Sequence, residues 1–369
     1  MTNCATAGTC NPIVISGDAP DTNPGTFKGF ADPSLAHDPA TSGRVWLAYS
    51  WPHVVVGQDQ VGNTVQLAAV ENRLARSDDN GATFHLVGTL WPDEAVTDPE
   101  GSGEIGRISS ETASLAVIKN ASGTTWYGAH LSYFLRPQTG YNPNYSTSWQ
   151  VRIGAAVSPD ALATSPETVL GVSTTAPAYH PAVLLDQLAG LSIQHCGMLN
   201  NPTLFTQNDT LYLVVECLAF VGTTLDFANS STRVFATLPN GAPSSWSWRY
   251  VGLLADHQLA VELSDDTIQQ PDVSLAADGT PIVLLTRAHA DPAVQIGTAG
   301  DGCLALELKS IDPPVLARDS FGKVVVRAEI RGTRLGACSH DPASVTGIVA
   351  HSQDASGGNW VIRSSGLRP

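Results

Sequence analysis

The stretch ADPSLAHDPATSGRVWLAYSW, residues 31–51, contains the unit that recurs along this chain. It runs from a polar residue and a proline through a short strand of small apolar residues to a turn and a longer apolar strand. Four later stretches repeat this order, and their leading residues are Glu111, Asn201, Gln270 and Asp341. Strands separated by Gly, Pro, Asn and Asp are typical of all-β proteins, and internal repetition indicates a repeat architecture.

The spacing of these units predicts a closed ring. Successive leading residues lie about 70 to 90 positions apart, which is too long for helical repeats and allows a four-stranded sheet with loops. Only 28 residues follow Asp341, whereas 31 precede Asp32, so the two ends together supply one further unit. We therefore predict an all-β, single-domain β-propeller over residues 1–369, in which an N-terminal strand completes the last blade and protects its edge.

We expect five blades, which begin near residues 32, 111, 201, 270 and 341. Six blades are the alternative, because YHPAVLL at 179–185 also opens on a residue followed by proline. Residues 172–200 are the longest departure from the repeat, and we interpret them as an insertion. A pair of β-sandwiches is the other architecture that would produce many short strands.

The charge balance restricts the partners of this protein. Acidic residues outnumber basic residues, 34 to 19, and the formal net charge is −15. Nucleic acids and anionic membranes attract basic surfaces, so neither is an expected partner. No stretch approaches the ~20 apolar residues of a membrane-spanning helix. The composition favours a soluble monomer that acts on neutral sugars or on cations.

The six cysteines form an even set without a C-x-x-C pair, which argues against zinc and thioredoxin-like sites. Six cysteines allow about 15 pairings, and pairing of neighbours along the chain gives Cys4–Cys10, Cys196–Cys217 and Cys303–Cys338. Disulfides persist in oxidising compartments, so we expect a secreted or periplasmic protein. Six buried, reduced thiols are the alternative.

The turn SDDNGATF, residues 77–84, carries a second pattern. Its residues follow S-x-D-x-G-x-T-F, which resembles the Asp box of the sialidase-like, or BNR, β-propeller superfamily. The resemblance implies a structural turn between the third and fourth strands of a blade, distant from the active site. Strict sialidase chemistry is not expected, because that family needs a late tyrosine nucleophile and the last 119 residues contain no tyrosine.

The stretch FADPSLAHDP, residues 30–39, resembles the first-blade aspartate motif of five-bladed glycoside hydrolases such as arabinanases, xylosidases and fructosidases. The resemblance implies that Asp32 is the base or nucleophile and that Glu111 is a second acid with an orienting or tuning role. Glu216, in the apolar run LYLVVECLAF, is then the candidate general acid, with Glu104 as its replacement. A carboxylate in such a strand is unfavourable unless it is paired or functional.

Residues that begin the innermost strands of a propeller converge on its channel, so distant parts of the chain can form one site. Sugar sites need aromatic platforms and side chains that form hydrogen bonds. We therefore expect substrate contacts from eight residues: Trp51, Arg107, Tyr133, Arg136, His180, His195, Asn201 and Gln270.

Two other functions would use the same leading residues. Their carboxylate and amide oxygens suit a central Ca²⁺ ion, for which Asp341 would be a ligand together with Asp32, Glu111, Asn201 and Gln270. A calcium-dependent lactonase or esterase would use such an ion, whereas a glycosidase would need no cofactor. The third class is a carbohydrate-binding propeller without catalysis. Divergent leading residues favour one central site, and the sequence favours a glycosidase acting on an oligo- or polysaccharide.

Overall fold

The computed structural model describes residues 2–4, 10–22, 27–58, 62–101, 103–135, 146–173, 183–184, 197–221, 224–290, 298–353 and 359–369. Within these ranges the strands form five blades around a channel, so the predicted all-β, five-bladed propeller is confirmed. The predicted insertion at 172–200 lies largely outside the described residues. Among the helices of the described ranges, none is long and apolar enough to cross a membrane.

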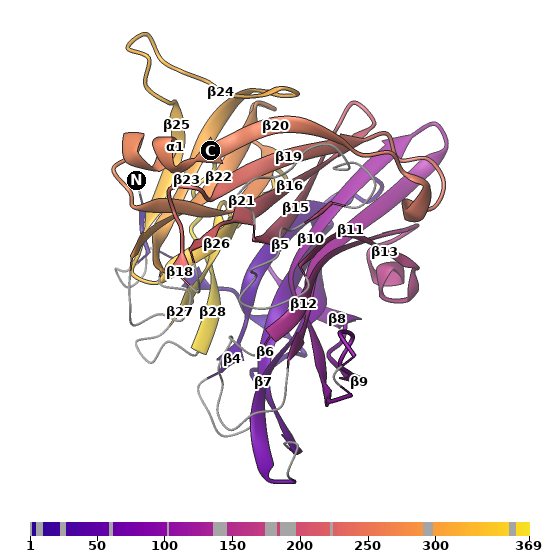
Figure 1. Ribbon diagram of the computed structural model, residues 1–369. Coiled ribbons are helices and arrows are strands. Elements are labelled where there is room, and N and C mark those ends of the chain that lie inside the picture. Colours follow the sequence, from indigo (N-terminus) through magenta and orange to yellow (C-terminus); the bar gives the residue numbers. More distant parts are fainter. Residues whose placement is uncertain are drawn as a thin grey trace.

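The first two blades are built from long antiparallel strands. From the channel outward, the first blade contains β5 (Ala31–His37), β6 (Val45–Gln58), β7 (Thr64–Ser77) and β8 (Phe84–Trp91). The second contains β10 (Ile105–Asn120), β11 (Gly123–Leu135), β12 (Ser146–Ala156) and β13 (Glu167–Ser173), flanked by β9 (Glu94–Thr97), β14 (Val183–Leu184) and the short helix η2 (Asp160–Thr164). Strands β6 and β7 continue past the ring as an extended hairpin (Figure 1).

The third blade contains β15 (Met198–Gln207), β16 (Thr210–Leu218), β19 (Ser231–Thr237) and β20 (Arg249–Asp256), with a small hairpin of β17 (Phe220–Val221) and β18 (Thr224–Leu225). The fourth contains β21 (Thr267–Leu275), β22 (Pro281–Ala290), β23 (Thr298–Ile311) and β25 (Val326–Arg331), with β24 (Pro314–Leu316) on β23. The fifth contains β26 (Leu335–Ser339), β27 (Val349–Gln353) and β28 (Asn359–Ser364). Two short helices, η3 (Pro243–Ser245) and α1 (His257–Glu262), connect strands.

Each blade packs against the blade on either side, which explains why its central strands are apolar along their length. In β16, Leu211, Leu213 and Val215 pack into the core shared with the second blade. The alternate residues, Tyr212 and Val214, pack into the core shared with the fourth blade. A strand buried on both faces is apolar throughout, because its side chains point alternately to either face. Glu216 therefore continues a strand that offers no exposed face.

The five innermost strands share one irregularity. In each of them the pairing register with the second strand shifts once, as in a β-bulge. One residue at each shift has a left-handed backbone, with φ between 45° and 54°, and we call these the bulge residues: Asp32, Thr112, Asn201, Gln270 and Ala337. All five line the channel. The bulge therefore brings one residue of every blade to the same level of the channel.

Two predicted leading residues do not occupy this position. In the second blade the bulge residue is Thr112, and Glu111 directly precedes it. In the fifth blade the innermost strand is β26, whose bulge residue is Ala337, so the expectation that Asp341 leads this blade is wrong. The physical reason is that a left-handed residue in a bulge needs neither a polar side chain nor a following proline. Asp341 is followed by proline, but it lies beyond the strand.

The residue two positions after each bulge residue ties adjacent blades together. We call this set the inter-blade ring: Ser34, Ser114, Thr203, Asp272 and Ser339. Three of its hydroxyls accept a backbone amide of the following blade, from Leu115 (3.2 Å), Leu204 (2.9 Å) and Leu35 (3.0 Å). The Thr203 hydroxyl donates to the Pro271 carbonyl at 2.7 Å, and the Asp272 carboxyl bonds the Ser339 hydroxyl and the His340 amide.

The start of the chain closes the ring. Strand β2 (Asn11–Pro12) pairs with β28 of the fifth blade, so the predicted N-terminal strand that completes the last blade is confirmed. Strand β4 (Lys28–Gly29) also pairs with β28. The same segment reaches the two adjacent blades, because β1 (Thr2–Asn3) pairs with β25 and β3 (Ile15–Ser16) pairs with β8.

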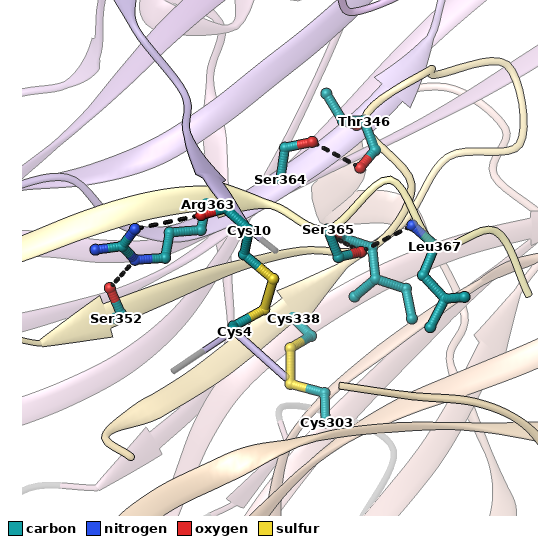
Figure 2. Close-up of a disulfide and its surroundings, with 11 residues drawn as sticks. Cys4, Cys10, Cys303, Cys338, Thr346, Ser352, Arg363, Ser364, Ser365 and Leu367 are labelled. Carbon is teal, nitrogen blue, oxygen red and sulfur yellow. Dashed lines mark hydrogen bonds between the residues drawn. A yellow bond between two sulfur atoms is a disulfide. The ribbon is translucent and has the colours of Figure 1, made fainter. Parts of the chain in front are cut away.

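One disulfide connects the fourth and fifth blades, and another lies within the N-terminal segment that pairs with both of them. Cys303 of β23 is joined to Cys338 of β26, and Cys4 is joined to Cys10, between β1 and β2. Figure 2 shows them beside one another, and Cys4 packs against the core that contains Cys303 and Cys338. Both pairings agree with the prediction. Cys217 is also disulfide-bonded, and its expected partner Cys196 lies outside the described residues.

Replacing Cys303 and Cys338 together by serine is expected to lower the free energy of unfolding by roughly 3 kcal/mol. This bond spans 35 residues and restricts the unfolded chain, and its loss frees the innermost strand of the fifth blade from β23. Denaturant unfolding measures the change. The matched control replaces Cys4 and Cys10, which are 6 residues apart, and a smaller loss is expected there. Equal losses for the two pairs would contradict this ranking.

The SDDNGATF turn connects β7 and β8, the third and fourth strands of the first blade. The Asp79 carboxylate accepts hydrogen bonds from the Ser77 hydroxyl (2.7 Å) and from both the amide and the hydroxyl of Thr83 (2.9 and 2.7 Å). Gly81 has φ +85°, and a Cβ there would lie 2.3 Å from the Ser344 hydroxyl. The turn therefore packs against the fifth blade, and strand register places it at the opposite end of its blade from Asp32.

Candidate active site

The bulge residues surround the mouth of a pocket in the channel. The pocket has a volume of about 340 Å³, which includes space that is open to solvent. Its lining includes three members of the inter-blade ring as well as the five bulge residues. The Thr112 hydroxyl has no hydrogen-bond partner among the described residues, although it is shielded from solvent. A shielded, unpaired hydroxyl in an open pocket suits a ligand with hydrogen-bonding groups.

Asp32 is the carboxylate at this mouth. Its backbone amide donates to Nδ1 of His351 at 3.1 Å, and the same nitrogen lies 3.3 Å from Oδ1 of its carboxylate. Its side chain is 17% exposed, so the carboxylate keeps access to the channel. The fifth blade therefore holds the residue that the sequence identifies as base or nucleophile.

Glu111 is the second carboxyl group, and its environment favours the protonated form. The hydroxyl of Tyr133 donates to Oε2 of Glu111 at 3.2 Å. Burial and, to a smaller extent, the negative charge of Asp32 raise the pKa of Glu111 to about 8, while the Tyr133 hydrogen bond acts in the opposite direction. At neutral pH this carboxyl group therefore favours its protonated form.

Tyr133 holds Glu111 from a rigid aromatic pair. Its ring stacks on Trp149 of β12, with ring centroids 4.2 Å apart and an angle of 22° between the planes. Tyr133 itself is buried, whereas Trp149 is half-buried. The sequence predicts Tyr133 as a substrate platform; the structure gives its hydroxyl to Glu111.

Replacing Tyr133 by phenylalanine is expected to raise the pKa of Glu111 further above about 8. The hydroxyl stabilises the ionised carboxylate, and phenylalanine keeps the ring on Trp149 but cannot donate a hydrogen bond. NMR titration of selectively labelled glutamate side chains measures the change. Tyr127→Phe, in the same strand, is the matched control and is expected to leave the Glu111 titration unchanged. A lower pKa in Tyr133→Phe would contradict this assignment.

Glu216 lies behind the bulge residues and is almost completely buried. Its Oε1 accepts the Gln270 amide at 2.7 Å, and its Oε2 accepts the side-chain amides of Asn201 (2.7 Å) and Asn200 (3.3 Å). Burial raises its pKa, and these three donors act in the opposite direction. Glu216 borders a smaller pocket of about 240 Å³ between the third and fourth blades. Neither Glu216 nor Glu111 is in the lining of the channel pocket, but Glu111 directly precedes the lining residue Thr112.

The Glu216 contact belongs to a repeated pattern. In four blades a side chain on the second strand accepts the backbone amide of the next blade's bulge residue, and we call these side chains the anchor residues: Ser50, Glu216, Thr286 and His351. Ser50 holds Thr112 at 2.9 Å, and Thr286 holds Ala337 at 2.9 Å. The anchor residues keep the left-handed bulge in place, and sequence reasoning did not identify this role.

Two other predicted substrate contacts, Arg107 and Trp51, interact with protein groups away from the bulge residues. Arg107 pairs with Asp93, which also lies 3.2 Å from Nε2 of His53. Trp51 lies beneath the guanidinium of Arg73, 3.5 Å from the ring centroid, and donates to a backbone carbonyl. These two residues therefore brace the extended β6–β7 hairpin and its neighbours. Three further predicted contacts lie outside the described residues: Arg136, His180 and His195.

The oxygen cage expected for calcium is not assembled by the predicted set. Asn201 and Gln270 do line the channel, but Oε1 of Gln270 already accepts the Ala337 amide at 2.8 Å. Asp341 lies after β26, where Oδ2 contacts Nδ1 of His37 at 2.9 Å and its amide at 2.8 Å. Asp341 therefore lies beside His37, beyond the innermost strand, and its role as a ligand of the same ion stays a prediction.

Asp272 is the channel residue that sequence reasoning missed. It lines the pocket and belongs to the inter-blade ring, where the other four members carry hydroxyls. Burial raises its pKa to about 7, although hydrogen bonds from Ser339 and His340 act in the opposite direction. Its position two residues after Gln270, matching Ser34 after Asp32, is the sequence signal that could have identified it.

No family model matches the sequence, and no curated protein matches it. Among solved structures, the fold is similar to Zg3597, a family 117 glycoside hydrolase produced by the marine bacterium Zobellia galactanivorans, with a TM-score of 0.51 and 12% identity over 96% of this chain and 88% of that chain.

Two further similar structures are an arabinoxylan arabinofuranohydrolase of glycoside hydrolase family 43 from Bacillus subtilis and the catalytic domain of the Coprinopsis cinerea GH62 α-L-arabinofuranosidase. The first has a TM-score of 0.46 and 16% identity over 94% of this chain and 67% of that chain. The second has a TM-score of 0.46 and 13% identity over 96% of this chain and 94% of that chain. Identities this low establish the fold alone. Glycoside hydrolases are thus among the structural neighbours of this chain, which has the fold of a five-bladed β-propeller.

Proposed function

We propose that this protein hydrolyses glycosidic bonds at the channel mouth formed by the bulge residues. Asp32 is the general base or nucleophile, and Glu111 is the general acid. The observation that carries the proposal is the arrangement of two carboxyl groups: Asp32 lines the channel pocket, and its negative charge acts on the neighbouring Glu111, whose pKa is raised to about 8. Glycosidases use two carboxyl groups whose surroundings divide them into an acid and a base.

Glu111 suits the acid role better than Glu216, which the sequence favours. A general acid must release its proton to the leaving group and needs access to the substrate. Both oxygens of Glu216 accept hydrogen bonds from protein groups, and the side chain anchors Gln270. Glu111 is partly exposed and makes its hydrogen bond to Tyr133 only through Oε2. We therefore assign Glu216 an anchoring role and Glu111 the proton transfer.

The substrate is an uncharged oligo- or polysaccharide, and the protein works outside the cytoplasm. A net charge of −15 disfavours anionic glycans near a mouth that already carries two carboxyl groups. The Thr112 hydroxyl and the Asn201 side chain provide hydrogen-bonding groups at the same mouth. Two described disulfides suit a secreted or periplasmic protein.

Incubation with a panel of neutral plant and algal polysaccharides tests the proposal, with release of reducing sugar as the measurement. We expect at least one glycan to be cleaved, and the rate to fall above pH 8 as Glu111 loses its proton. The double variant Asp32→Asn/Glu111→Gln is the inactive control, and the exposed Glu94→Gln is the matched neutral control. Binding of a glycan without its cleavage would favour a carbohydrate-binding propeller, and loss of activity in EDTA would favour a metal-dependent hydrolase.

A further inference from the structure

We propose that His351 is the positioning residue for Asp32. By accepting the Asp32 amide, it fixes the left-handed backbone at this residue and thereby the direction of the carboxylate. The kinetic part of this inference rests on the proposed function, whereas its structural part does not.

The contact involves one nitrogen and two atoms of Asp32. Nδ1 of His351 lies 3.1 Å from the Asp32 amide nitrogen and 3.3 Å from Oδ1. When Nδ1 carries no proton, it accepts the amide hydrogen; when it carries one, it donates to Oδ1 instead. The two side chains are only 14% and 17% exposed, so water competes weakly for either contact. His351 therefore contacts Asp32 whether or not its Nδ1 carries a proton.

The repeat of the fold shows what this bond does. Ser50, Glu216 and Thr286 make the equivalent bond to the bulge residues of three other blades. The four anchor residues have only one property in common, a side-chain atom that accepts a hydrogen bond: they are a serine, a glutamate, a threonine and a histidine. The common role is consequently to hold the backbone of the bulge. Of the four bulge residues held in this way, Asp32 alone carries a carboxylate.

The backbone of Asp32 needs such support. Its φ is 45°, a left-handed conformation that residues other than glycine adopt at a cost, and that persists only when surrounding contacts hold it. Rotation of this backbone toward an ordinary strand conformation would redirect the carboxylate. A displacement of about 1 Å in a reacting group can lower a rate by roughly a hundredfold. Loss of the bond should therefore reduce catalysis although the acid itself remains.

His351→Ala and His351→Ser test this inference. Serine is chosen because Ser50 makes the same bond in the first blade. We expect the Asp32 amide to exchange with solvent faster in His351→Ala and close to the wild-type rate in His351→Ser, measured by NMR. We also expect kcat to fall roughly ten- to hundredfold in His351→Ala with little change in KM, and to recover in His351→Ser.

Thr286→Val is the matched control, because it removes the same bond at Ala337, a bulge residue without a functional group. Because Oε1 of Gln270 also accepts the Ala337 amide at 2.8 Å, exchange at Ala337 should increase less than exchange at Asp32 does in His351→Ala, and kcat should stay unchanged. Wild-type exchange at the Asp32 amide in His351→Ala overturns the inference, and so does a wild-type kcat in that variant. If the wild-type protein cleaves no glycan, the proposed function fails, while the exchange rates still decide the role of His351.

Discussion

Replacing Asp32 by asparagine is expected to lower kcat roughly a thousandfold while KM changes little. The amide of asparagine is almost the same size as the carboxylate, but it can neither accept a proton readily nor attack a sugar carbon. It also removes the negative charge that raises the pKa of Glu111, so the acid loses its proton at a lower pH than in the wild-type protein. Steady-state rates on the cleaved glycan, measured as a function of pH, record both effects.

The fold indicates that Asp32→Asn changes the chemistry of the site and not the folding of the protein. Asn201 occupies the equivalent bulge of the third blade, with the same φ of 45° as Asp32. Asparagine tolerates the left-handed conformation well, so Asp32→Asn should keep the wild-type melting temperature. Asp160→Asn, at an exposed position of η2, is the matched control for the substitution. An Asp32→Asn protein with wild-type kcat would remove Asp32 from the reaction.

Replacing Asp272 by asparagine is expected to stabilise the protein by about 4 kcal/mol at pH 8 and to have little effect at pH 4. The folded protein holds the pKa of Asp272 at about 7, above its ordinary value of 3.8. Between these values the unfolded chain has released the proton, while the folded protein still binds it. Wild-type stability therefore falls as pH rises from about 4 to about 7, and asparagine has no proton to lose.

Denaturant unfolding at pH 4, 5.5, 7 and 8.5 measures this difference. The advantage of Asp272→Asn should increase through the first three values and then remain constant. Asp272→Ser, which restores the hydroxyl present elsewhere in the inter-blade ring, should also remove this contribution to the pH dependence. Asp160→Asn serves again as the exposed control, with no such trend expected. A stability difference that does not vary with pH would show that Asp272 titrates normally in the folded protein.

The sequence predicts the ring well because its units repeat and because X-Pro steps mark three of the five bulges. Asp32, Asn201 and Gln270 all precede a proline and all occupy the bulge position. Thr112 and Ala337 precede an alanine and a cysteine, so their bulges carry no such mark. The steric requirement lies in the backbone, where φ is positive, and side-chain polarity is a poor guide to it.

The site was harder to predict than the fold. The sequence points to Asp32 and Glu111 as candidates because the ring brings together carboxylates near the start of innermost strands. His351 was missed, since its partner is 319 positions away and depends on how the last blade meets the first. Glu216 was noticed for a sound reason, a carboxylate in a buried strand, but its compensation comes from three amides that only the fold reveals.

The pairing of β1, β2, β3 and β4 with three different blades has a consequence for how the chain reaches this structure. The partners of β1, β2 and β4 are β25 and β28, which lie more than 300 residues further along the chain. Strands β1, β2 and β4 therefore cannot pair until the last two blades are present. Contacts this distant in sequence form slowly, so completion of the ring is expected to be the late, rate-limiting step of folding.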